Sequence, residues 1–120
     1  MRPPEMLSDI PVIKTRHYWY PRKDEKDVVA LPKVPCSAWK SSEGEVAVVF
    51  VNWASEAIEF TYKEDTVEYG FSEGTAISCS DLTDNGREPN GQLTSGICQE
   101  TITLPARSVK ILVLKGIMVQ

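Results

Sequence analysis

The amino-acid sequence predicts an all-β fold, an antiparallel β-sandwich with Greek-key connections and six to eight strands. Short runs rich in β-branched and aromatic residues recur along the chain, and clusters of Gly, Asn, Ser and Pro separate them. No segment has the apolar spacing of a convincing amphipathic helix, which argues against βαβ units. An open barrel is the alternative architecture. The length of 120 residues fits one domain with a sizeable core.

The strongest strand signal is the run VAVVFVNW at 46–53, which is too short and too β-branched to predict a helix. Both of its alternating sets are apolar, one ending in Phe50 and the other in Trp53. Because a two-layer sandwich buries only one face of each sheet, we expect something to cover the second face. The cover could be the N-terminal segment, a neighbouring domain or a second copy of the chain.

The next run, 57–63, alternates cleanly and predicts a half-exposed strand with Ile58, Phe60 and Tyr62 facing inward. Further strands are expected at 34–39, 76–82, 98–104 and 108–115. Turn signals at 84–86 and 90–91 flank Pro89 and predict a long loop or a loose hairpin. The predicted core consists of apolar residues on the inward strand positions: Val48, Phe50, Ile58, Phe60, Ile102, Val109, Ile111 and Val113.

Residues 1–27 differ in character from the sandwich domain expected at 28–120. They hold four prolines, the aromatic run HYWY at 17–20 and a charge cluster at 22–27. Prolines at this density predict an extended or irregular lead-in. Three adjacent aromatic rings are costly to leave in water, so we expect this lead-in to lie against another surface.

The composition of the chain limits the kinds of partner that we expect it to bind. A net charge of −4, with basic and acidic residues scattered along the chain, provides no basic stripe for nucleic acid. No apolar run is long enough to span a membrane, and no signal peptide is recognisable, so the localisation stays open. The cysteines, Cys36, Cys79 and Cys98, lack metal-ligand spacing. We expect them to be buried thiols, with one disulfide and a leftover thiol as the alternative.

The order of these signals resembles a known family. Trp39 precedes a glycine turn, VAVVFVNW follows, and the ending ITLPARSVKIL at 102–112 forms a Leu-Pro-x-x-Ser-Val-like corner. These features are similar to the C-terminal β-sandwich of glycoside hydrolases related to the α-amylase clan, and more narrowly to bacterial glycosidase-like proteins of a domain-of-unknown-function family. The resemblance covers about residues 30–116. It implies an accessory domain that packs on a catalytic barrel, and these 120 residues do not contain such a barrel.

The chain offers little catalytic chemistry. Its 17 acidic residues fall mostly in turns or on outward strand positions, where a solvated carboxylate is expected. The single histidine, His17, lies in the lead-in without a nucleophile motif. Oxygen-bearing residues at 81–90 match no calcium loop and are explained by turn formation. We therefore expect no catalytic residues, no metal and no cofactor.

Two hypotheses for the function follow. The first is a non-catalytic accessory domain of a glycoside hydrolase, whose partner is the catalytic barrel or a second copy of the chain. The second is an independent carbohydrate-binding module that stacks exposed aromatic rings on sugars. The aromatic residues that serve either as sugar platforms or as interface residues are Trp19, Tyr20, Trp39, Trp53 and Tyr69.

Overall fold

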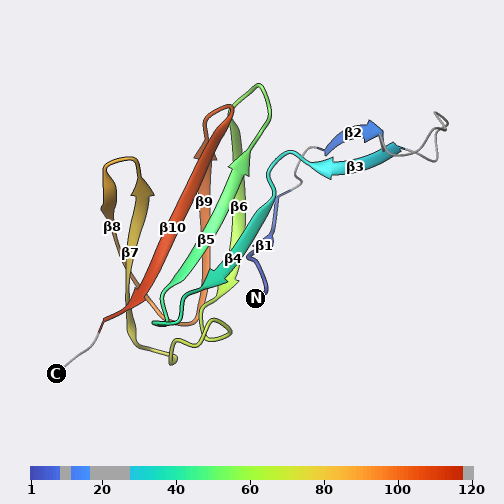
Figure 1. Ribbon diagram of the computed structural model, residues 1–120. Helices are drawn as coiled ribbons and strands as arrows, with labels where there is room; N and C mark the ends of the chain where they lie inside the picture. Colours follow the sequence, from blue (N-terminus) through green and yellow to red (C-terminus); the bar gives the residue numbers. More distant parts are fainter. Residues whose placement is uncertain (9–11, 17–27, 118–120) are drawn as a thin grey trace.

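The computed structural model describes residues 1–8, 12–16 and 28–117, with only the backbone course given for 12–16 and 28–32. The described part of the chain is built from strands and contains no helix. Eight strands form two antiparallel sheets that pack face to face, which confirms the predicted sandwich (Figure 1). No described helix could therefore cross a membrane.

The smaller sheet has three strands in the order β1-β6-β9. They are β1 (Glu5–Met6), β6 (Ile58–Asp65) and β9 (Ile97–Leu104). The larger sheet has five strands in the order β4-β5-β10-β7-β8. They are β4 (Cys36–Lys40), β5 (Val46–Asn52), β10 (Ser108–Gly116), β7 (Ala76–Thr83) and β8 (Gly86–Thr94). The last strand returns to lie between β5 and β7, which is a Greek-key arrangement.

The core lies between the inner faces of the two sheets. β5 alternates between buried and half-buried positions, and its inward residues Val46, Val48 and Phe50 have no exposed surface. The ring of Phe50 contacts two rings from β6, with centroid distances of 5.4 Å to Phe60 and 4.8 Å to Tyr62. These three aromatic residues hold the sheets together at the centre of the molecule.

The predicted core is confirmed on β5 and β6 but is wrong in part on β10. Val109 is 58% exposed, because the register places Lys110 opposite Phe50 and Leu112 opposite Val48. The inward positions of β10 are therefore the even-numbered ones. Among the other predicted core residues, Ile102 and Ile111 are partly buried and Val113 is buried on the outer side of the sheet.

Two regions are more regular than the sequence indicated. Residues 86–94 form strand β8, so the loose hairpin was the correct alternative; the pairing shifts register beside Pro89. The turn between β7 and β8 consists of Asp84 and Asn85, and Gly86 follows it with a φ of 98°, which glycine adopts without strain. The lead-in 1–27 contains the short strand β1 and strand β2 (Val12–Arg16), which pairs with β3 (Val28–Pro32).

A buried asparagine ties the two connections at one end of the sandwich. Asn52 has no exposed surface, and its Nδ2 donates to the carbonyl oxygens of Glu56, Leu104 and Pro105 at 3.0–3.1 Å. Its Oδ1 accepts a hydrogen bond from the Ala54 amide at 3.0 Å. The Asn at the end of β5 therefore joins the β5–β6 turn to the Leu-Pro corner between β9 and β10.

Candidate functional site

The outer face of the five-stranded sheet is apolar across β4, β5 and β10. We use the name outer face for the apolar residues that alternate away from the core on these strands: Trp39, Ala47, Val49, Val51, Val109, Ile111 and Val113. Val51 lies opposite Val109, and Val49 lies opposite Ile111. The residues on β5 and Ile111 are half-buried, whereas Trp39 and Val109 are 66% and 58% exposed. This face carries the second apolar set that the sequence analysis found on β5.

Trp39 is the most exposed tryptophan of the described residues. It lies on an edge strand opposite Ala47, and its indole Nε1 donates to the Ser37 hydroxyl oxygen at 2.9 Å. This hydrogen bond restrains the polar end of the indole on the outer face. The ring is therefore available to pack against another surface.

The other predicted aromatic residues do not join Trp39 in one row. Trp53 follows β5 and is 37% exposed, and Tyr69 is buried in the core with 3% of its surface exposed. A ring with so little exposure cannot stack on a sugar, so Tyr69 is a core residue rather than a site residue. Trp19 and Tyr20, like His17, lie outside the described residues.

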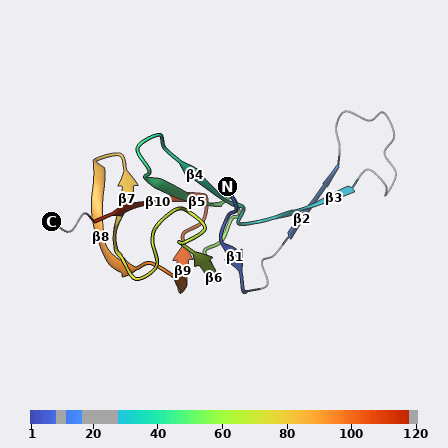
Figure 2. The same ribbon diagram turned by 90° about the horizontal axis from the view of Figure 1, so that it is seen from below.

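The β2–β3 hairpin stands clear of the sandwich. It pairs five residues of each strand, and both views show it projecting away from the two sheets (Figures 1 and 2). No sandwich strand makes more than marginal contact with it, and the molecule is accordingly elongated, with extents of 62 × 26 × 26 Å. An isolated two-stranded hairpin is marginally stable in water, so this hairpin needs a surface to pack on.

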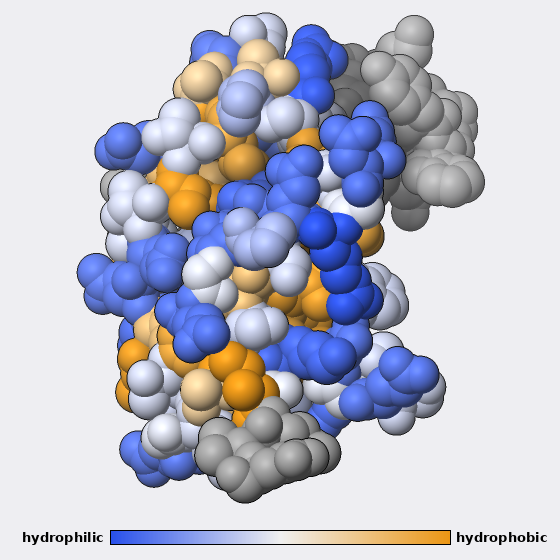
Figure 3. Space-filling model, turned by 90° about the vertical axis from the view of Figure 1, so that its left-hand side faces the viewer, coloured by the Kyte–Doolittle hydropathy of each residue, from blue (hydrophilic) through white to orange (hydrophobic). Residues whose placement is uncertain are grey.

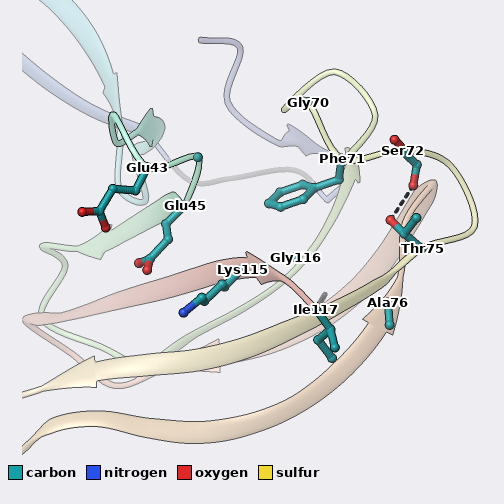
Figure 4. Close-up of a pocket in the computed structure, with 11 residues that line it drawn as sticks. Glu43, Glu45, Gly70, Phe71, Ser72, Thr75, Ala76, Lys115, Gly116 and Ile117 are labelled. Carbon is teal, nitrogen blue, oxygen red and sulfur yellow. Dashed lines mark hydrogen bonds between the residues drawn. The ribbon is translucent and has the colours of Figure 1, made fainter. Parts of the chain in front are cut away.

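A pocket of about 740 Å³ lies at the end of the sandwich where β10 finishes (Figure 4). The half-buried ring of Phe71 points toward Gly116, and the side chains of Glu45 and Lys115 project beside them. Glu45 pairs with Arg87 at 2.6 Å, and this hydrogen bond holds the pKa of the carboxyl below its usual range. The pocket thus presents an aromatic ring beside fixed charges.

A smaller cavity of about 150 Å³ opens between β9 and the β7–β8 hairpin. It is lined by Glu64, which is 4% exposed and whose Oε2 has no hydrogen-bond partner among the described residues. Burial, and secondarily the charge of Glu100, raises the pKa of Glu64 to about 7. The sequence analysis treated the acidic residues as mostly solvated. Extending the alternation of Ile58, Phe60 and Tyr62 by one step would have placed Glu64 inward.

The three cysteines are free thiols. Cys79 is buried, as expected, while Cys36 and Cys98 are only partly buried. Burial, with added repulsion from Glu64, raises the pKa of Cys79 to about 11, so this thiol is protonated at neutral pH. A protonated, buried thiol is a poor nucleophile.

The polar side chains on the described surface form few groups that could carry out catalysis or bind a metal. Asp81 pairs with Lys110 at 3.0 Å and accepts a hydrogen bond from Asn90, as turn and strand residues do. No three His, Cys, Asp or Glu side chains of the described ranges are grouped so as to hold a metal ion. Seen from the β7–β8 side, apolar residues reach the surface in patches bordered by polar ones (Figure 3).

Neither a scan of family models nor a search of curated proteins finds a match for this chain.

Proposed function

We propose that this chain is a non-catalytic accessory β-sandwich of a glycoside hydrolase, which packs its β2–β3 hairpin and its outer face against the catalytic barrel. The observation that carries the proposal is the projecting hairpin, because it makes almost no contact with its own sandwich. Its strands contain Val12, Ile13, Val28, Val29 and Leu31. An apolar two-stranded ribbon of this kind gains stability when another surface covers it.

The outer face supports the same role. Trp39 and Val109 are exposed beside the half-buried valines of β5, so the face is apolar over three adjacent strands. Contiguous exposed apolar patches are typical of interaction sites. Interfaces between domains of one polypeptide have the same mixture of exposed aromatic and aliphatic residues with a polar border. The resemblance of residues 30–116 to glycosidase accessory domains makes a barrel the expected partner.

Two experiments test this role. The first reads the genomic DNA upstream of the codon for Met1, where we expect coding sequence for a catalytic barrel with paired carboxylates. The second assays the isolated chain with chromogenic glycosides, for which we expect no turnover. Turnover that is lost when one carboxylate is replaced would contradict a non-catalytic role.

The exposed indole of Trp39 supports a second candidate, an independent carbohydrate-binding module. The two candidates differ in a glycan-array experiment. An accessory domain binds soluble glycans weakly or not at all, whereas a binding module would give micromolar affinity that disappears in the Trp39→Ala variant. The matched control is Ile97→Ala, which changes an exposed apolar residue on the other sheet.

A further inference from the structure

The two sheets of the sandwich differ in width, and the difference leaves a gap beside β9. The smaller sheet ends at β9, whereas the larger sheet continues through β10 to β7 and β8. The 150 Å³ cavity lies at this step and is lined from both sheets: by Glu64 and Glu100 from β6 and β9, and by Asn90 and Gln92 from β8. Oxygen-bearing side chains from three strands therefore meet in one small space.

Glu64 is the unusual residue in this space. Only 4% of its surface is exposed, and its Oε2 is buried without a hydrogen-bond partner among the described residues. A buried carboxyl oxygen that lacks a partner costs free energy, and native proteins normally satisfy such an atom with a donor, a water or an ion. Oε2 of Glu64 therefore needs a proton, a water or an ion as its partner.

Glu100 brings a second carboxylate to the same place. The register pairs Glu100 with Tyr62 and Cys98 with Glu64, so Glu64 and Glu100 are diagonal neighbours on the inner face of the sheet. Diagonal neighbours on antiparallel strands have Cβ atoms roughly 7 Å apart, within the span of one bridging ion. Two carboxylates that face one cavity repel each other unless a proton or a cation lies between them.

The amide side chains of the lining can supply oxygen ligands to a hard cation. Asn90 uses its Nδ2 to donate to Asp81 at 3.0 Å, so its Oδ1 is not engaged in that bond, and Gln92 adds a second amide. Lys110 is engaged by Asp81 at 3.0 Å. Calcium accepts carboxylate, amide and water oxygens, and the cavity has room for several waters at about 30 Å³ each.

We propose that this cavity binds a hard divalent cation of the calcium class, with the carboxylates of Glu64 and Glu100 as its charged ligands and amide and water oxygens completing the shell. The proposal does not depend on the proposed accessory function. It predicts that the ion joins β6 and β9 to the β7–β8 hairpin and stabilises the wider side of the sandwich.

The competing assignment is that Glu64 simply keeps its proton. The titratable or charged groups around Glu64 come from two cavities that it lines. The first cavity brings Tyr62, Cys79, Glu100 and the Lys110–Asp81 pair, with Cys98 opposite Glu64 on β9. The second brings Tyr69, Arg2, Glu5, Lys63, Asp65 and Glu68. Since no positive charge is paired with Glu64 in this set, protonation and cation binding are alternatives that a titration with the metal distinguishes.

The test measures the thermal midpoint of the chelator-treated chain at about pH 8, where Glu64 is largely ionised, with and without about 10 mM CaCl₂ at matched ionic strength. With a dissociation constant of about 1 mM, we expect the midpoint to rise by roughly 5 °C or more. The Glu100→Gln variant should lose most of this rise, and Glu64→Gln should lose all of it. The Glu88→Gln variant, which removes an exposed carboxylate on β8, should keep it.

A second measurement reads binding directly. Tyr62 lines the cavity, so Tb³⁺ bound there is expected to luminesce on excitation of the aromatic residues, and Ca²⁺ should displace it. The Glu100→Gln variant serves here if Glu64→Gln does not fold, because Glu100 lies at the exposed mouth of the cavity. No calcium-dependent shift in the parent, or a shift that both variants retain, would overturn the proposal and assign Glu64 as a protonated core residue.

Discussion

Replacing Asn52 tests how much the hydrogen bonds of its side chain stabilise the fold. The Asn52→Ala variant removes the amide that bridges the β5–β6 turn to the Leu-Pro corner. Three carbonyl oxygens share the two N–H groups of Nδ2, and Oδ1 accepts one further bond, so about three hydrogen bonds are effective. At about 1 kcal/mol each, their loss should destabilise the fold by about 3 kcal/mol, and the partners left unpaired in the interior can only add to this value.

Chemical denaturation measures this free energy directly, and a thermal melt should show a decrease of roughly 10–20 °C for a domain of this size. The matched control is Asn85→Ala, because Asn85 is exposed in the β7–β8 turn and its side chain makes no hydrogen bond among those identified. This variant should stay within about 0.5 kcal/mol of the parent. A melting temperature of Asn52→Ala within a degree or two of the parent would refute the bridging role.

Three further predictions follow from the same structure. Phe50→Ala should destabilise the chain by roughly 3–5 kcal/mol in denaturant titrations, because the ring is fully buried between the sheets; a loss below about 1 kcal/mol would contradict the core assignment. Glu64 binds its proton more tightly in the folded state, where its pKa is about 7 against an ordinary 4.5. Without added divalent cation, the free energy of unfolding should therefore fall by about 3 kcal/mol as the pH rises from 4.5 through 7. The Glu64→Gln variant should not show this fall. Val109→Ser should leave the melting temperature within a few degrees of the parent, since the residue is 58% exposed; a large loss would place it in the core.

The sequence predicts the sandwich well because its strongest signals are local. The alternation of Ile58, Phe60 and Tyr62 specifies which side of β6 is buried, and the β-branched run at 46–53 specifies a central strand. The inward face of β10 could not be read in the same way, since Val109, Ile111, Leu112, Val113 and Leu114 are all apolar. Only the pairing of β10 with β5 decides which of them face the core.

The residues of the candidate site were harder to predict from the sequence than the strands. Tyr69 was predicted as a candidate sugar-stacking or interface aromatic, but the turn that follows β6 folds it into the core. Glu64 carries no motif; its burial follows from the alternation along β6, and its closeness to Glu100 becomes evident only from the register of β6 against β9. The two-sided apolar character of β5, in contrast, was visible in the sequence and is realised as the outer face. Positions whose burial depends on long-range pairing are those that local patterns miss.

Hydrogen exchange tests the central claim most directly, because it reports whether the β2–β3 hairpin is covered. The measurement compares this domain alone with the same domain joined to the barrel that the upstream reading frame is expected to encode. Packing on the barrel predicts that the amides of Val12–Arg16 and Val28–Pro32 exchange rapidly in the isolated domain and are protected in the joined protein. The buried strand β5 should be protected in both and serves as the internal reference. Equal exchange of the hairpin in the two proteins would contradict the account.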